Sequence, residues 1–234
     1  MTPLIFLPGM MCDARLFGPQ IDVLSNQRPV MTFPLSGHDS VEALAADILL
    51  NAPPVFALAG LSMGGIVAME ILRRAPDRIT RLALLDTSPL AETPELAASR
   101  EPQMIKAKAG KLEEVMRDEL KPSYLAPGPK RVEVLNLVLD MARELGPDVF
   151  IRQSRALQRR RDQQGTLRRC KVPTLVLCGE HDALCPVKRH QFIAELIPDA
   201  SLTVIEDAGH LPTLERPGAT TDALRDWISA PLSS

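Results

Sequence analysis

The stretch Gly60-Leu61-Ser62-Met63-Gly64 places a serine between two glycines, each two residues away. This G-x-S-x-G spacing is typical of a sharp turn from a strand to a helix that exposes the serine hydroxyl. Glycine is needed there because a side chain would clash with the neighbouring strand and helix. The five residues alone are moderately specific, but an apolar run at residues 54–58 and a helical pattern at 66–74 flank them. Ser62 is therefore predicted to be a nucleophile.

A serine hydroxyl attacks efficiently when a base removes its proton and a carboxylate holds that base in the correct tautomer. Of the four histidines in the chain, His210 follows a predicted strand at residues 201–205. Asp182 follows the preceding predicted strand, at residues 173–178. The loops after parallel strands meet at one edge of a sheet. We therefore expect Ser62, Asp182 and His210 to lie together as nucleophile, acid and base.

Asp86 is the alternative acid, because it ends the predicted strand at residues 79–85, the next strand after the serine. If it is not the acid, Asp86 is expected to cap a loop. The other histidines are given structural roles. His38 is expected in a turn and His190 on the surface of a helix, and His181 is expected to shape the loop of the acid.

The order of the elements predicts how these residues are positioned. Short apolar runs alternate with helical segments along most of the chain. Such alternation is typical of a parallel sheet with helices on both faces. Between residues 91 and 171, however, helical segments follow one another without a strand. The predicted strands are residues 3–7, 30–33, 54–58, 79–85, 173–178 and 201–205. The predicted helical segments of the long insertion are residues 96–109, 112–120, 132–145 and 149–161.

The chain resembles the serine hydrolases of the α/β-hydrolase superfamily, and the resemblance covers nearly its whole length. It implies an α/β-hydrolase fold with a mostly parallel sheet of about six strands flanked by helices. It also implies a core of residues 1–88 and 172–234, with a helical lid inserted at residues 89–171. The blocks that carry the resemblance are residues 7–10, 60–65 and 179–182, Gly209-His210 and Glu215-Arg216-Pro217.

The resemblance further implies an oxyanion hole, in which two backbone N–H groups bind the negative charge of the transition state. Met63, immediately after the nucleophile, and Met10, in the loop after the first strand, are the expected donors. Many relatives have His-Gly where this chain has Pro8-Gly9, which leaves open what supports the loop. Met11 and Leu211, beside these loops, are candidates for contacting the substrate.

The expected activity is hydrolysis of a carboxylic ester of a small molecule through an acyl-enzyme intermediate, without a cofactor or a metal ion. Arg152 and Arg155 of the insertion are candidates for binding an anionic group of the substrate, because guanidinium pairs well with carboxylate and phosphate. The alternative is that the arginines of the insertion form a solvated surface. Thioester hydrolysis, C–C bond hydrolysis and cofactor-free perhydrolysis would use the same residues. A small-molecule receptor of the same fold is the alternative of a different class.

Composition argues against some classes of partner and predicts the compartment in which the protein resides. The net charge of −2 argues against nucleic acid or an anionic membrane as a partner. No apolar run reaches the length of about 18 residues that a membrane span needs, and the N-terminal residues do not resemble a signal peptide. The four cysteines lack a zinc-site spacing and are expected to be reduced thiols of a cytoplasmic protein, with a Cys178–Cys185 bridge as the alternative. The oligomeric state is left open.

Overall fold

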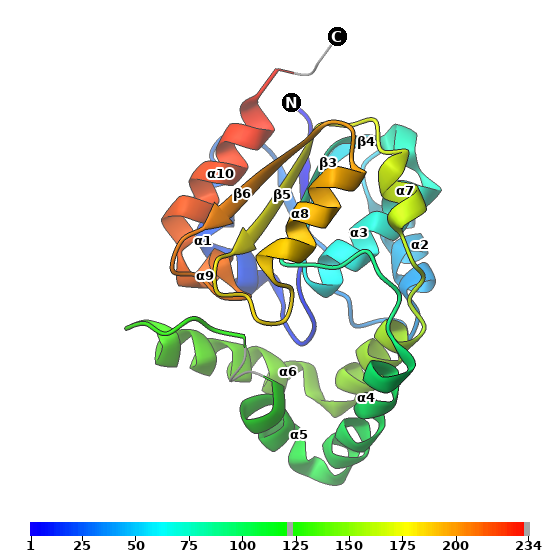
Figure 1. The fold of residues 1–234 in the computed structure, drawn as a ribbon, viewed down its shortest axis with the longest axis vertical. Helices are drawn as coiled ribbons and strands as arrows, with labels where there is room; N and C mark the ends of the chain where they lie inside the picture. The colour runs from blue at the N-terminus through cyan, green and yellow to red at the C-terminus, as the bar shows by residue number, and fades with distance from the viewer. Residues whose placement is uncertain (121–123, 232–234) are drawn as a thin grey trace.

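The computed structural model describes residues 1–120 and 124–231, without the side chains of residues 119 and 120. Its centre is one sheet of six parallel strands in the order β2-β1-β3-β4-β5-β6, which confirms the predicted architecture (Figure 1). The strands are β1 (Leu4–Leu7), β2 (Val30–Thr32), β3 (Phe56–Leu61), β4 (Ile79–Leu85), β5 (Thr174–Gly179) and β6 (Ala200–Ile205).

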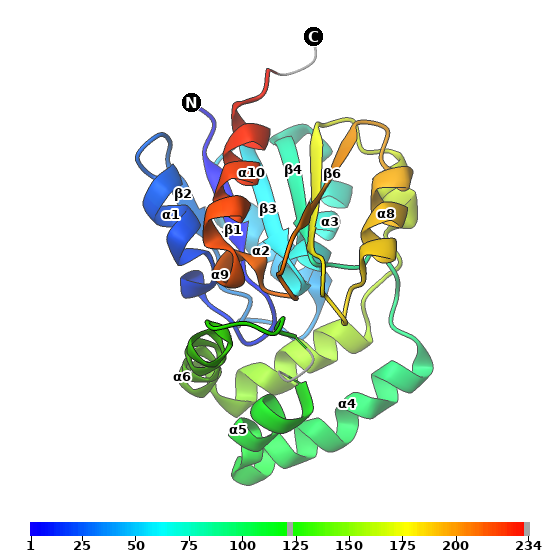
Figure 2. The same ribbon diagram turned by 60° about the vertical axis from the view of Figure 1, so that its left-hand side comes forward.

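Helices cover both faces of the sheet, as Figures 1 and 2 show. One face carries α1 (Gly18–Leu24), α9 (Pro212–Glu215) and α10 (Pro217–Ser229). The other face carries α2 (Val41–Asn51), α3 (Met63–Arg74), α7 (Gln164–Arg168) and α8 (Val187–Leu196). Successive side chains of a strand point to opposite faces, so Leu58 packs in the layer of α2 and α3. Its neighbour Ala59 packs in the layer of α1 and α10.

The segment between β4 and β5 is helical, as predicted, and lies beyond the carboxyl ends of the strands (Figures 1 and 2). It has its own apolar cluster, which includes Met104, Val115 and Phe150. Its elements are α4 (Pro94–Lys106), two π-helical turns η3 (Ala107–Lys111) and η4 (Val115–Leu120), α5 (Leu112–Glu114), α6 (Arg131–Gln158) and the α7 helix already named. Residues 121–123 of the predicted lid and residues 232–234 of the predicted core lie outside the described residues.

Some element boundaries differ from the predictions. β3 extends to Leu61, directly before the serine, whereas the apolar run predicted its end at residue 58. The two helices predicted at residues 132–145 and 149–161 form the single element α6 with a kink at Gly146, which has φ 79°. Pro147 follows Gly146 and lacks the N–H that an unbroken helix would use, which explains the kink. The short helices α7 and α9 were not predicted.

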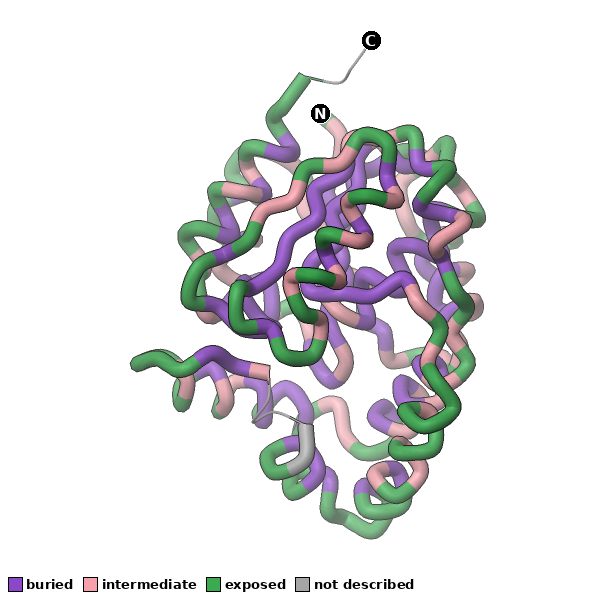
Figure 3. Tube along the Cα trace, viewed as in Figure 1, coloured by how far each residue is buried: buried purple, intermediate pink, exposed green. Residues whose placement is uncertain are grey.

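Burial follows this layered arrangement. The central strands β1, β3 and β5 are buried along their whole length, whereas the edge strands β2 and β6 are partly exposed (Figure 3). All four cysteines are free thiols, so the alternative Cys178–Cys185 bridge does not form. Among the described residues, no helix is both long and apolar enough to span a bilayer.

Candidate active site

Ser62 sits at the junction of β3 and α3 in a conformation that few residues adopt. Its backbone has φ 55° and ψ −115°, a strained combination for a residue with a side chain. Neighbouring groups fix it there. The Ser62 N–H donates to the carbonyl of Leu85 at 2.9 Å, and the Thr87 hydroxyl donates to the Ser62 carbonyl at 2.7 Å. The role of Thr87 is not visible in the sequence motif.

The glycines near Ser62 are required because other backbone segments approach them closely. A Cβ atom on Gly60 would collide with the carbonyl of Gly64. A Cβ on Gly64 would in turn collide with the carbonyl of Leu7 at the end of β1. The spacing in the sequence thus reflects two backbone contacts, one between β3 and α3 and one between α3 and β1.

The structure brings Ser62, His210 and Asp182 into one hydrogen-bonded chain. Nε2 of His210 lies 2.9 Å from Oγ of Ser62, and Nδ1 of His210 lies 2.8 Å from Oδ2 of Asp182. His210 is 1% exposed and Asp182 is 3% exposed. A base buried between a hydroxyl and a carboxylate can remove the hydroxyl proton and keep its own charge stabilised.

The surroundings of Asp182 favour its ionised form. Oδ1 accepts from the backbone N–H groups of Leu184 and Cys185, each at 2.9 Å. Burial alone would raise the pKa of Asp182, but His210 and the Cys185 N–H hold it below its ordinary value. The carboxylate that orients His210 is therefore charged.

Asp86, the alternative acid, occupies a different place. It is fully buried, has φ 43°, and accepts from the Gly179 N–H through Oδ1 at 2.9 Å. Its Oδ2 has no donor among the described residues. Burial, followed by the nearby charge of Asp182, raises the pKa of Asp86 well above its ordinary value. Asp182, and not Asp86, makes the hydrogen bond to His210.

The expected oxyanion donors both lie beside Ser62. Met63 is the first residue of α3, so its N–H lacks an acceptor within the helix. Met10 follows Gly9, and a Cβ on Gly9 would lie 3.5 Å from Cβ of Ser62, which is ordinary van der Waals contact. The Met10 N–H makes no hydrogen bond within the described part of the chain.

A buried glutamine supports the Met10 loop. The backbone N–H of Met11, a residue with φ 54°, donates to Oε1 of Gln153 at 2.8 Å. Nε2 of Gln153 donates to the carbonyl of Leu35 at 2.9 Å, and Gln153 is 1% exposed. Gln153 of α6 therefore holds the Met10 loop in a chain that has proline at position 8. The only signal in the sequence is one amide among the apolar positions of a helix.

The His210 loop has its own support, which comes from Glu215 in one of the blocks noted in the sequence. Oε1 of Glu215 accepts from the Leu211 N–H at 2.9 Å, and Oε2 accepts from the Gly209 N–H at 3.0 Å. Oε2 also accepts from the Ala126 N–H of the helical insertion at 2.7 Å. Glu215 therefore ties the base loop to the insertion.

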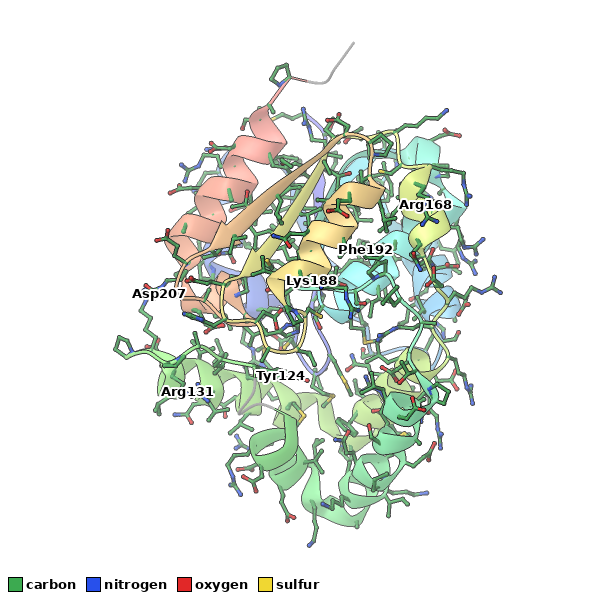
Figure 4. The ribbon with its side chains drawn as sticks, in the orientation of Figure 1. Tyr124, Arg131, Arg168, Lys188, Phe192 and Asp207 are labelled. Atoms are coloured by element: carbon green, nitrogen blue, oxygen red, sulfur yellow. The ribbon has the colours of Figure 1, made fainter. Side chains whose placement is uncertain are left out.

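Tyr124 adds a second contact between the insertion and the base loop. Its carbonyl accepts from the His210 N–H at 2.6 Å, and its ring centre lies 5.1 Å from that of the imidazole. Figure 4 shows Tyr124 where the insertion meets the sheet domain.

The four predicted substrate contacts have other partners. Met11 is fully buried in the apolar cluster of the insertion, and Leu211 is buried with α9 and α10. Nε of Arg152 donates to the Ser36 carbonyl at 2.8 Å. Arg155 forms an ion pair with Glu101. Among the described residues, none of the four forms a hydrogen bond with Ser62.

The prediction for His190 is wrong, because this residue of α8 is fully buried. Its Nε2 accepts from the Thr87 N–H at 3.0 Å, which is possible only for the neutral ring. Burial lowers the pKa of His190 to about 4. His190 therefore braces the residue that holds the Ser62 carbonyl.

Two groups of side chains have metal-ligand chemistry within the described residues. One comprises Asp182, Cys185 and His210, and the other comprises Glu180, His181 and Asp207. In the first group, Asp182 and His210 are already bonded to each other. The second group is exposed and lies on the loops after β5 and β6.

Comparison with known proteins gives a consistent result. A family model described as the alpha/beta hydrolase family matches residues 4–223. A pimeloyl-[acyl-carrier protein] methyl ester esterase of Aromatoleum aromaticum is 29% identical over 90% of this chain and 94% of its own length. A thermophilic esterase from Thermogutta terrifontis, solved with malate bound, has a TM-score of 0.90 at 27% identity and covers 97% of this chain and 89% of its own. The enol-lactonase from Burkholderia xenovorans shares the fold, with a TM-score of 0.86 at 24% identity over 98% of this chain and 92% of its own.

Proposed function

The chain belongs to the alpha/beta hydrolase family, and on that premise we propose that it is a serine esterase whose triad is Ser62, His210 and Asp182. One observation carries the proposal. It is the continuous hydrogen-bonded path from the Ser62 hydroxyl through His210 to the ionised Asp182. The relatives named as esterases support the reaction class.

The reaction proceeds in two halves. In the first half, Oγ of Ser62 attacks the ester carbonyl carbon while Nε2 of His210 takes the hydroxyl proton. The N–H groups of Met10 and Met63 bind the oxyanion of the tetrahedral intermediate. The C–O bond to the alcohol then breaks, and His210 gives its proton to the departing oxygen. The acyl group remains on Ser62.

The second half uses the same residues with water as the nucleophile. His210 takes a proton from water, which attacks the acyl-serine carbonyl. The second tetrahedral intermediate collapses, the Ser62 oxygen regains a proton from His210, and the carboxylic acid leaves. Asp182 stabilises the imidazolium in both halves. No step requires a metal ion or an organic cofactor.

The substrate we propose is an ester of an acyl chain with a small alcohol. The support comes from relatives of nearly equal length that are named as methyl ester esterases of an acyl-carrier-protein conjugate. We further propose that residues 89–171 act as a lid over the ester. The contacts of Gln153 with the Met10 loop, and of Tyr124 and Ala126 with the base loop, support this role.

The test is turnover by purified wild type and Ser62→Ala on paired esters and thioesters of the same acyl chain. We expect wild type to hydrolyse the methyl ester faster than the thioester and Ser62→Ala to hydrolyse neither. Faster thioester cleavage would reassign the enzyme to thioester hydrolysis on the same triad. A wild type that turns over no ester or thioester would contradict the proposal and favour a receptor of the same fold.

A further inference from the structure

Three arginines from three separate segments of the chain lie near the residues that border the proposed triad. They are Arg100 of α4, Arg160 after α6 and Arg189 of α8. We propose that these arginines form a subsite for an anionic group, a carboxylate, carried by the ester substrate. The inference rests on the proposed esterase function and adds the class of substrate that the enzyme prefers.

Glu92 pairs with two of these arginines. Its side chain is 2% exposed and accepts from Nε and Nη2 of Arg100, each at 2.7 Å. The same carboxylate accepts from Nη1 of Arg160 at 3.2 Å. The side chains of Arg100 and Arg160 are only 18% and 12% exposed. One carboxylate therefore balances two poorly solvated guanidinium groups.

Arg189 adds a third positive charge without adding a negative one. Its Nη1 donates to the neutral hydroxyl of Ser88 at 2.6 Å. In the described ranges, no carboxylate forms an ion pair with Arg189. With Glu92 counted once, the three arginines retain two net positive charges. Charges held partly out of water are stabilised by an opposite charge, so this arrangement favours an anion.

The arginines lie close to the Met10 loop and to the turn that carries Ser62. Nη1 of Arg100 is 3.8 Å from Sδ of Met10, the expected oxyanion donor. Ser88, the partner of Arg189, directly follows Thr87, whose hydroxyl holds the Ser62 carbonyl. The subsite thus borders both the oxyanion loop and the turn that carries the nucleophile.

The loop of the triad acid borders the same arginines. Cys185 donates its backbone N–H to Asp182. Burial, followed by the charges of Asp182 and Asp86, raises the pKa of the Cys185 thiol, while the charges of Arg189 and Arg160 oppose that rise. The two guanidinium groups therefore lie within electrostatic range of the acid loop.

Several N–H groups of these guanidinium side chains have no oxygen acceptor within the described part of the chain. Nη1 of Arg100 faces only a thioether, which is a weak acceptor. Nη2 of Arg160, and Nε and Nη2 of Arg189, make no hydrogen bond within the described part of the chain. Guanidinium donors bind carboxylate oxygens in pairs. A substrate with its ester carbonyl at Ser62 and a carboxylate at these donors would use both sites together.

The two arginines predicted from the sequence to bind an anion are not part of this subsite. The guanidinium groups of Arg152 and Arg155 are directed to Ser36 and Glu101. Arg189 was not predicted because it lies in the core helix α8, outside the arginine-rich insertion.

The experiment compares two methyl esters of equal chain length. One is the monomethyl ester of a dicarboxylic acid, and the other is the methyl ester of the matching monocarboxylic acid. We expect wild type to have the higher kcat/KM on the carboxylate-bearing ester. Arg189→Gln should lower the charged-to-neutral ratio of kcat/KM about tenfold or more, mainly through KM, as expected for a lost charge-assisted hydrogen bond. Arg189→Glu should lower the ratio further.

Arg159→Gln is the matched control, because it removes one arginine charge from an exposed position one residue before Arg160. It should leave the ratio as in wild type. A wild-type ratio of one, or equal effects of Arg159→Gln and Arg189→Gln, would overturn the proposal. A phosphate-bearing ester that is preferred in wild type but not in Arg189→Gln would support the subsite and identify phosphate as its ligand.

A binding measurement separates this inference from the esterase function itself. Calorimetry of Ser62→Ala with the free dicarboxylate should detect binding that Ser62→Ala/Arg189→Gln weakens. If wild type hydrolyses no ester but this binding is observed, the esterase proposal fails while the anion subsite stands. If esters are hydrolysed but the dicarboxylate does not bind, the subsite alone is wrong.

Discussion

The carboxyl groups of Asp86 and Asp182 are both buried and interact with each other, and that of Asp182 also bonds to His210. Their pKa values shift in opposite directions. Burial and the charge of Asp182 raise that of Asp86, whereas His210 lowers that of Asp182 against the effect of burial. A protonated Asp86 can donate to Asp182, which supplies a partner for an Oδ2 atom that is otherwise unpaired. Two acids near one base therefore have separate roles.

This relationship predicts unequal effects of two conservative substitutions. Asp182→Asn should lower kcat by about 10⁴, because the imidazole would lose its orienting charge and correct tautomer. Asp86→Asn should lose at most about tenfold, since an amide can still accept from Gly179 and donate to Asp182. Steady-state kinetics on one ester checks both variants. The reverse ranking would make Asp86 the triad acid.

The same pair predicts an effect on stability. Above its ordinary pKa of 3.8, Asp86 ionises freely in the unfolded chain but not in the folded one, so ionisation favours unfolding. Asp86→Asn should therefore raise the free energy of unfolding at pH 7 by on the order of 1 kcal/mol or more. The gain should shrink as the pH falls through 3.8 and vanish below it, where both states hold the proton. Urea unfolding at several pH values measures it, and a gain independent of pH would contradict the assignment.

The support of the Met10 loop by Gln153 predicts a catalytic effect at a distance. Gln153→Leu removes the acceptor of the Met11 N–H and should displace the neighbouring oxyanion donor. We expect kcat to fall by about 10- to 100-fold with a smaller change in KM, because the interaction lost belongs to the transition state.

Gln158→Leu is the control for this substitution. Gln158 lies on the same helix but donates to Ala97 and Glu101 of α4, and it makes no hydrogen bond to the Met10 loop within the described part of the chain. Its kcat should stay near that of wild type. Equal losses in kcat for the two variants would indicate a general effect of disturbing the insertion.

The buried His190 predicts how stability depends on pH. Its pKa of about 4 lies below the unfolded value of 6.5, so the unfolded state binds the proton first as the pH falls. Between pH 6.5 and pH 4, the protonation of His190 in the unfolded chain should lower the free energy of unfolding by about 1.4 kcal/mol for each pH unit of acidification. His190→Gln should reduce this slope by about one proton. An unchanged slope in His190→Gln would contradict a buried neutral ring.

The sheet and the Ser62, Asp182 and His210 set were predictable because their signals are local. Each functional residue follows an apolar strand, and parallel strands end at one edge. The contacts of the site with the insertion were not predictable in the same way. Gln153 supports Met11 across 142 residues of sequence, and nothing in either local pattern indicates that pairing.

The sequence likewise does not show which arginine side chains lie near the site. The arginine-rich segment that contains Arg152 and Arg155 predicts positive charge, but composition does not predict the direction of each side chain. The structure directs them to Ser36 and Glu101, while Arg189 approaches Ser88 from the core. His190 was misassigned because helical periodicity does not reveal that Thr87 needs a buried acceptor.

The central claim is that Ser62 carries the acyl group during turnover. The most direct measurement is the mass of the protein after brief reaction with a fluorophosphonate, followed by mapping of the modified peptide. We predict one adduct on the peptide that contains Ser62, loss of esterase activity in proportion to labelling, and no adduct in Ser62→Ala. Full esterase activity in Ser62→Ala, or labelling at another residue while Ser62 stays unmodified, would contradict the account.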